Sequence, residues 1–442
     1  MTPSAFSPAV EALGQEMYQL ASELFPICRS LTGAGVRQTL QTIGRLIPLR
    51  MHEVPSGTAV FDWTVPPEWN IRDAYVADAR GHRVVDFNRH NLHVVNYSVP
   101  VRARMSRAEL DAHLFSLPEK PDWIPYRTAY YERSWGFCLS HRQRLALPEG
   151  EYDVVIDSTL EPGHLSYGEY CLPGELPDEI LISCHVCHPS LGNDNLSGIA
   201  LATFLARHVA TEPRRYSYRF LFIPGTIGSI TWLARNQALV SRIKHGLVLT
   251  CVGDAGKPTY KRSRQGSAEI DRAVGHVLRH SGAPFEIQDF IPWGYDERQY
   301  CSPGFNLAVG CLMRTPNGRY PEYHTSADDL SLIGPRHLAD SFATCAAVLA
   351  VLEGNHRCIN LNPKCEPQLG RRGLYEAMAT AQNARDPQMA MLWVLNLSDG
   401  SHSLLDIAER ANIPFGLVRE AADQLCQHNL LARLTESGEV SQ

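Results

Sequence analysis

The period of the hydrophobic positions changes three times along the chain. Between residues 9 and 47, apolar residues recur every three or four positions, which predicts two helices. From 52 to 168, apolar residues form short runs separated by Pro, Gly and Asn, which predicts an inserted all-β domain built as a sandwich or a barrel. Its predicted strands are residues 60–63, 74–76, 84–87, 92–95 and 151–156, and residues 106–115 predict one helix with a Ser106–Glu109 capping box. The aromatic residues of this insert favour an ordinary core over a ligand platform.

Strands and helices alternate from Glu179 to about Gly354. Predicted strands are residues 180–185, 218–224, 246–252, 285–291 and 307–313, and predicted helices are residues 196–209, 229–239, 267–281 and 336–352. This alternation is typical of an α/β layer. We therefore predict an α/β domain, residues 1–51 and 169–365, with a mainly parallel mixed sheet and helices on both faces.

The residues from 371 to 442 have a third pattern. Short helices are predicted at 389–397, 403–411 and 415–428, and a closing strand at 430–434, which is the order of a winged helix-turn-helix. The predicted recognition helix carries Arg419 beside Glu420 and Asp423, a poor charge pattern for binding phosphates. A packing or protein-contact role is therefore favoured over DNA binding.

Composition and charge exclude several classes of protein function. The 442 residues include 41 Lys+Arg and 47 Asp+Glu, a formal net charge of −6, so nucleic acid is not an expected partner. The 12 cysteines are scattered and do not form a small disulfide framework. The N-terminus lacks the pattern of a signal peptide, and no charge-free apolar run suggests a membrane span. We expect a cytoplasmic protein with no membrane partner, and a homo-oligomer stays open.

Polar residues follow the predicted strands at the edge where open α/β sheets bind ligands. His185, His188 and Asp194 follow the first strand, Asp254 follows the third, and His324 follows the last. Imidazole and carboxylate donors that converge from distant positions form a set that zinc accepts.

Two alternatives apply to the first of these loops. Its Asn, Asp and Ser residues also suit the simple task of ending a strand and capping a helix at Asn195 or Ser197. A zinc knuckle made by Cys184, Cys187 and the two histidines is disfavoured, because the four lie too close in sequence to surround one tetrahedral ion.

The motifs at these positions resemble known proteins. Asn-Asp-Asn-Leu-Ser-Gly at 193–198 and Tyr-His-Thr-Ser-Ala-Asp at 323–328 resemble signatures of the co-catalytic zinc aminopeptidases. Nearly the whole chain resembles a family of bacterial aminopeptidase-like proteins described with polysaccharide biosynthesis. The further matching phrases are His-Val-Cys-His-Pro at 185–189, Thr-Cys-Val-Gly-Asp at 250–254, Asp-Glu-Arg-Gln-Tyr-Cys-Ser-Pro-Gly at 296–304 and Pro-Glu-Tyr-His-Thr-Ser at 321–326.

The resemblance implies a zinc-dependent hydrolase of an amide or peptide bond. It implies one or two zinc ions and a small peptide-like or aminoacylated substrate. His185 and His324 then correspond to imidazole ligands, Asp194 to the bridging carboxylate and Asp254 to a further ligand, with His188 as an alternative to His185.

One position departs from this pattern. The aminopeptidases carry two adjacent glutamates after the second strand, a general base and a metal ligand, whereas this chain has Pro224-Gly225. A positioned base contributes about 10²–10⁴ in rate, so Gly225 implies impaired activity or a chain that never used a base there. Glu322, Glu297 and Asp296 are substitute candidates, although such carboxylates are more often exposed or ion-paired.

The loop 293–300 lies beside the predicted crevice and is expected to contact substrate. Its candidates are Tyr295, Asp296 and Arg298, together with Tyr323 from the last motif; Arg298 suits either a substrate carboxylate or an internal Arg–Asp bridge. Two rival functions stay open: a catalytically inactive zinc-binding scaffold, and a DNA-binding regulator acting through the winged helix.

Overall fold

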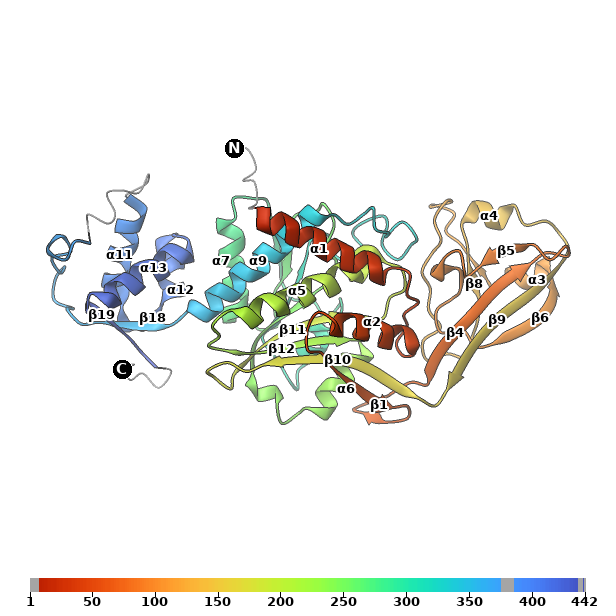
Figure 1. Ribbon diagram of the computed structural model, residues 1–442, viewed down its shortest axis with the longest axis horizontal. Helices are drawn as coiled ribbons and strands as arrows, with labels where there is room; N and C mark the ends of the chain where they lie inside the picture. The colour runs from red at the N-terminus through yellow and green to blue at the C-terminus, as the bar shows by residue number, and fades with distance from the viewer. Residues whose placement is uncertain (1–7, 375–384, 436–439, 441–442) are drawn as a thin grey trace. The chain divides into compact units, whose positions relative to one another are not determined.

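The structure of the protein is a computed structural model that describes residues 8–374, 385–435 and 440 (Figure 1). The chain forms two compact units: Met1–Ala268 with Glu286–Ala343, and Glu269–Phe285 with Thr344–Gln442. Parts of the predicted winged-helix domain, residues 375–384, 436–439 and 441–442, lie outside the described residues, as do residues 1–7.

An eight-stranded sheet organises the first unit. Its strand order is β1-β10-β12-β11-β13-β16-β14-β15, and the four central strands β12, β11, β13 and β16 run parallel. The strands are β1 Arg50–Pro55, β10 His164–Leu172, β11 Glu179–His185, β12 Ser217–Ile223, β13 Ile243–Leu249, β14 Thr259–Lys261, β15 Glu286–Gln288 and β16 Val309–Met313. Strands β1, β10 and β14 join it by antiparallel pairing, and β15 pairs parallel with β14 at the far edge, which confirms the predicted mainly parallel mixed sheet.

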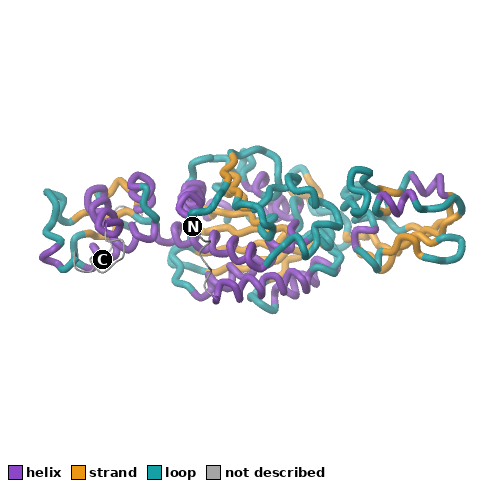
Figure 2. The backbone as a smooth tube through the Cα atoms, turned by 90° about the horizontal axis from the view of Figure 1, so that it is seen from above, coloured by secondary structure: helices purple, strands orange, loops and turns teal. Residues whose placement is uncertain are grey.

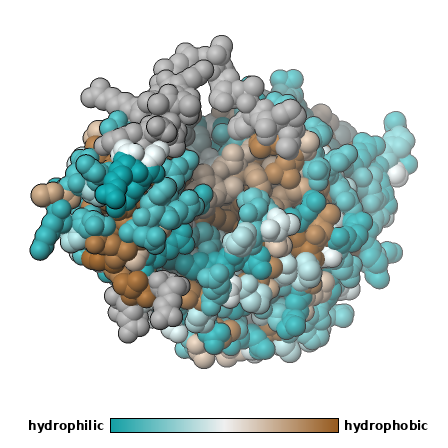
Figure 3. All heavy atoms as spheres, turned by 60° about the vertical axis from the view of Figure 1, so that its left-hand side comes forward, coloured by the Kyte–Doolittle hydropathy of each residue, from teal (hydrophilic) through white to brown (hydrophobic). Residues whose placement is uncertain are grey.

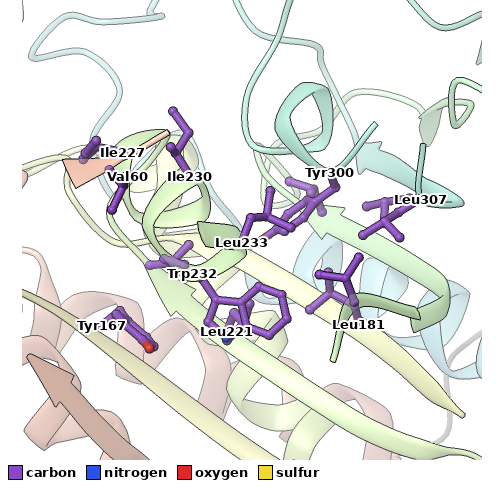
Figure 4. Packing of buried hydrophobic residues seen from close by; sticks show 14 of the residues in the cluster. Val60, Tyr167, Leu181, Leu221, Ile227, Ile230, Trp232, Leu233, Tyr300 and Leu307 are labelled. Atoms are coloured by element: carbon purple, nitrogen blue, oxygen red, sulfur yellow. The ribbon is translucent and has the colours of Figure 1, made fainter. Parts of the chain in front are cut away.

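Helices cover both faces of this sheet (Figure 2). Gly168 of β10 faces Leu40 on one side, whereas its neighbour Tyr167 belongs to a hydrophobic cluster on the other. The first face carries α1 Pro8–Leu24, α2 Ala34–Gly44 and α5 Ser197–Thr211, and the second carries α6 Ile227–Arg235 and α8 Glu297–Tyr300. Figure 4 shows the cluster under α6, where Trp232 and Leu233 pack with Leu181 of β11.

Helix α9, Pro335–Gly354, is long and apolar enough to span a membrane by length and composition alone. Half of its most apolar window is buried inside the protein. Its first turn also packs closely on Gly14 of α1. These are the properties of a core helix.

The β-rich insert is built on one four-stranded antiparallel sheet of order β5-β4-β9-β6. Its strands are β4 Glu68–Ala77, β5 Arg83–Asp86, β6 Val101–Ser106 and β9 Glu151–Glu161. The predicted sandwich or barrel is therefore wrong: loops, the pair β7 Leu114–Phe115 and β8 Phe137–Cys138, and the short helices α3 Arg107–Asp111 and α4 His141–Leu145 take the place of a second sheet. The Ser106–Glu109 capping box is confirmed, although α3 ends earlier than predicted.

Two predicted strands of the insert are also wrong. Residues 60–63 form the turn of a hairpin between β2 Ala59–Val60 and β3 Trp63–Thr64, with Phe61 in the left-handed region at φ 57°. Residues 91–93 form a short 3₁₀ helix, because the His90 side chain accepts a hydrogen bond from the Leu92 amide and caps its first turn.

The second unit has the predicted order of three short helices and a closing strand. Helices α11 Arg385–Leu397, α12 Leu404–Ala411 and α13 Phe415–Gln427 accompany a three-stranded sheet of order β18-β17-β19. Its strands are β17 Arg357–Asn360, β18 Asp399–Ser403 and β19 Leu431–Arg433, and α7 Glu269–His280 belongs to the same unit.

Hydrophilic residues cover most of the face seen in Figure 3, and the hydrophobic residues there form separate patches. This distribution is ordinary for a chain that buries most of its apolar residues.

Candidate metal centre

Strand β11 and the loop after it carry the first site residues. Leu181, Ser183 and His185 alternate along the strand and share one face, and the Ser183 hydroxyl lies 3.0 Å from that of Tyr300. The loop then returns to the sheet and enters α5. There the Asn195 side-chain oxygen accepts a hydrogen bond from the Gly198 amide at 3.2 Å, although the N-cap position of α5 is held by Leu196 and not by the predicted Asn195 or Ser197.

Imidazole rings surround the carboxylate of Asp194, which is fully buried. The His185 Nε2 atom lies 2.8 Å from Oδ1, and the His188 Nδ1 atom lies 3.3 Å from Oδ2. The potential ligand atoms of these three residues all lie within 4.8 Å of one another. A third ring, that of His324, reaches Oδ2 of Asp194 at 3.1 Å through Nε2.

The electrostatics keep Asp194 and His185 in the forms that bind a metal. Burial alone would raise the pKa of Asp194, but the charge of His188 and hydrogen bonds from the imidazoles outweigh it and hold this pKa well below its ordinary value. Burial lowers the pKa of His185 to about 4, against the hydrogen bond to Asp194. At neutral pH the site therefore offers an ionised carboxylate and a neutral imidazole.

This donor set fits zinc. Two buried imidazole nitrogens and a carboxylate oxygen are common protein ligands of that ion, and His324 lies at the open side with 35% of its side chain exposed. An Asp194 carboxylate buried among rings would also be costly without a cation or donors to compensate its charge.

The structure keeps Asp254 outside this group. Its Oδ1 accepts hydrogen bonds from the Gly256 amide and the Thr315 hydroxyl, and its Oδ2 accepts from the Thr315 amide and from the Asn193 side chain. The carboxylate that the resemblance assigned to the metal thus holds the loop before Asp194 in place.

A second buried carboxylate, Asp328, was not singled out from the sequence. It accepts hydrogen bonds from the backbone amides of Asn193 at 2.6 Å and Asp194 at 3.1 Å, and from the Tyr320 hydroxyl. Burial, helped by the charge of Asp194, raises the pKa of Asp328 to about 7. Its position four residues after His324 in the closing motif was the available signal.

The substitute bases have different surroundings. Glu297 is buried in an ion pair with Lys261 and also accepts from the Tyr295 amide, so it is committed within its own loop. Asp296 is buried and accepts from the Ser229 hydroxyl at 2.7 Å. Glu322 is half-buried, and its backbone oxygen binds the Thr325 amide and hydroxyl.

Among the predicted substrate contacts, two aromatic rings lie directly on the histidines. Tyr295 stacks on His185 with 3.7 Å between ring centroids, and Tyr323 stacks on His324 at 4.0 Å. Arg298 makes no salt bridge with a carboxylate of the described residues, and its Nε is buried without a hydrogen-bond partner there. The internal Arg–Asp bridge is therefore not formed in this part of the chain.

The insert supplies a site residue that the sequence did not indicate. The Tyr126 ring meets His188 and His324 edge-on, each with centroids 5.1 Å apart, and its hydroxyl lies 3.0 Å from that of Tyr130. Aromatic residues that fill a core and those that face a ligand look alike in the sequence. Only the fold could therefore distinguish Tyr126 from the other aromatic residues of the insert.

The sheet, its helices and the buried histidine–aspartate cluster at the strand ends define an aminopeptidase-like protein. The chain belongs to the family described as Domain of unknown function (DUF4910), which matches residues 18–355, and residues 356–433 match a winged helix-turn-helix family. The second match confirms the predicted winged helix, and the relatives described next confirm the resemblance drawn from the motifs.

Individual relatives agree with this assignment. A Clostridium acetobutylicum protein, provisionally named a polysaccharide biosynthesis protein with aminopeptidase-like domain, is 53% identical over 418 residues, which cover 95% of this chain and 96% of that protein. A crystal structure of a provisionally assigned peptidase from the same species has a TM-score of 0.92 at 52% identity, covering 96% and 97% of the two chains. The zinc aminopeptidase BSAP from Bacillus subtilis, at 11% identity, a TM-score of 0.57 and coverage of 78% and 94%, shows the shared fold.

Proposed function

We propose that this protein is a zinc-dependent hydrolase of an amide bond in a small peptide-like or aminoacylated substrate. The observation that carries the proposal is the convergence of three imidazoles on the buried carboxylate of Asp194. Zinc bound there would supply a Lewis acid for the carbonyl of the substrate. The fold shared with zinc aminopeptidases supports this class of reaction, and the provisional name of the Clostridium relative supports a substrate from polysaccharide biosynthesis.

The chain's own residues have three tasks in this proposal. Asp194 and the imidazoles hold the ion, and Asp328 fixes the backbone that presents Asp194. Tyr126 and Tyr323 pack on the histidines and exclude water from the buried side. Glu322 takes the role of proton acceptor, because its carboxylate has no partner in the described residues, whereas Glu297 is ion-paired with Lys261 and Asp296 accepts from Ser229.

A second candidate function is a zinc-binding scaffold without catalysis. It is favoured by Gly225, which stands where a general base is expected, and by the Tyr295 ring that lies against it. Both functions require the metal, so they differ only in turnover.

The test is metal analysis of the purified protein combined with turnover of a panel of aminoacyl amides and aminoacylated amino sugars. Hydrolysis that is lost with a chelator, restored by zinc and absent in Asp194→Asn supports the hydrolase. Bound zinc without turnover of any compound supports the scaffold instead, and a protein that binds no zinc contradicts both.

A further inference from the structure

Residues 225 and 295 occupy complementary space. A Cβ atom placed on Gly225 would lie 2.0 Å from Cε1 of Tyr295 and 2.8 Å from its Cδ1, far inside van der Waals contact. The atoms in its way belong to an aromatic ring close to the Tyr295 backbone. The ring therefore fills the space that any side chain at 225 would need.

The same Tyr295 side chain contacts the histidines of the candidate metal centre. Its hydroxyl oxygen lies 3.0 Å from Nε2 of His188 and 3.4 Å from Sγ of Cys187, and its face lies on His185. On His188, Nδ1 faces Asp194 while Nε2 faces Tyr295. When Nδ1 of His188 binds a metal, Nε2 carries the proton and donates a hydrogen bond to the Tyr295 hydroxyl oxygen. This hydrogen bond fixes the orientation of the His188 ring.

Among the carboxylates near this side of the centre, Asp296 accepts from Ser229 through Oδ1, its Oδ2 is buried without a hydrogen-bond partner in the described residues, and it lies outside the group of donors that could share an ion. Two other carboxylates are engaged through both oxygens or in an ion pair. Asp254 is bound to Thr315, Gly256 and Asn193, and Glu297 is paired with Lys261. Position 225 offers no side-chain ligand. Within the described residues, one cluster of three donors lies close enough together to share an ion.

We propose that Tyr295 closes one side of the centre, filling the space beside Gly225 and positioning His188, so that the centre holds a single metal ion. This inference rests on the proposed function for its metal and deepens it, because a one-ion centre must orient and activate its substrate without a second cation. Tyr295 is thus a positioning residue that acts through His188.

The first test counts ions. Metal-free full-length protein is titrated with zinc chloride by calorimetry, and the loaded protein is desalted and analysed by elemental mass spectrometry. We expect one zinc per chain. Two zinc ions per chain at sites lost together in Asp194→Asn would overturn the proposal and leave the proposed function standing.

The second test removes the Tyr295 hydroxyl and keeps the ring. Tyr295→Phe should lower zinc affinity by roughly 10–100-fold, the usual effect of losing a hydrogen-bond partner of a metal-binding histidine. It should also shift the visible absorption bands of the cobalt-substituted protein. Tyr152→Phe is the matched control, because it also removes one hydroxyl hydrogen bond, here to the Pro148 oxygen within the insert, at a residue with no role in the centre; its zinc affinity should stay unchanged. Equal affinities and spectra for wild type and Tyr295→Phe would overturn the positioning role.

The third test exploits the contact between residues 225 and 295. Gly225→Ala should displace the ring and weaken zinc binding by about 10-fold or more, whereas the same change in a Tyr295→Ser background should alter affinity by less than about 2-fold. Equal effects in both backgrounds would show that the ring does not depend on Gly225. A metal-free melting temperature for each variant separates loss of fold from loss of binding. A wild-type protein that binds no zinc would remove the proposed function together with this inference.

Discussion

The backbone amide of Tyr126 donates a hydrogen bond to the carbonyl oxygen of His324 at 2.8 Å. The neighbouring residues extend this contact, since Pro125 forms a β-bridge with Thr325 and the Ser326 amide binds the Ile124 oxygen. The insert is therefore built into the wall of the metal centre.

Replacing the Tyr126 side chain tests this role of the insert. Tyr126→Ala leaves a cavity against His188 and His324, and we expect a loss of unfolding free energy of about 3–5 kcal/mol together with weaker zinc binding. Tyr126→Phe removes only the contact with the Tyr130 hydroxyl and should cost about 1 kcal/mol. Urea unfolding of the metal-free proteins and zinc titration measure the two effects. Variants of equal stability and affinity would contradict the packing role.

Zinc should stabilise the fold through Asp194. At a free zinc concentration of 100 times Kd, the gain in unfolding free energy is about 2.7 kcal/mol, visible as a higher melting temperature that a chelator reverses. Asp194→Asn should remove the gain. Asp254→Asn is the control: its carboxylate binds Thr315 and Asn193, so the variant should lose stability but keep its response to zinc. If Asp254→Asn loses the response to zinc while Asp194→Asn keeps it, Asp254 binds the ion and the ligand set given above is wrong.

The central sheet, and the loop that carries the histidine–aspartate cluster, could be predicted from the sequence. Strand β11 is buried along its whole length, so its unbroken apolar run was visible, and His185 ends it as predicted. The sequence also placed the polar residues of 185–194 and 324 at one sheet edge, where the structure brings four of them together. The parallel strands made this possible, because their carboxyl ends must meet.

Contacts between distant loops were not predictable. Asp254 was assigned to the metal by its motif, but the Thr315 hydroxyl and amide that bind it lie 61 residues away. The strand β14 has only three residues, too few to show a period. Tyr126 and the ring of Tyr295 likewise reach the centre through tertiary packing, which leaves no local pattern.

The buried ion pair between Lys261 and Glu297 should be the main anchor of the loop 293–300. Lys261 also donates to the Trp293 oxygen at 2.6 Å. Lys261→Met leaves the Glu297 charge buried without a partner, and we expect a loss of about 3–5 kcal/mol in urea unfolding at pH 7. Lys261→Met combined with Glu297→Gln should recover most of that loss, since no unpaired charge remains. A double variant as unstable as the single one would show that the pair contributes by packing alone.

Asp296 should make the stability of the protein fall as the pH rises from about 4 to 7. Burial, opposed by the Ser229 hydrogen bond, raises the pKa of this carboxyl from 3.8 to about 7, so between these values the folded state binds a proton that the unfolded state has released. This loss of unfolding free energy is absent below pH 3.8, grows as the pH rises and is complete above a pH of about 7. Its full size is on the order of 4 kcal/mol.

Asp296→Asn keeps an acceptor for Ser229 and removes the titration, so its advantage over wild type in the free energy of urea unfolding should grow between pH 4 and about pH 7. Asp62→Asn, at an exposed position, is the control for the loss of one negative charge. Parallel pH profiles for wild type and Asp296→Asn would mean that Asp296 is ionised in the folded protein.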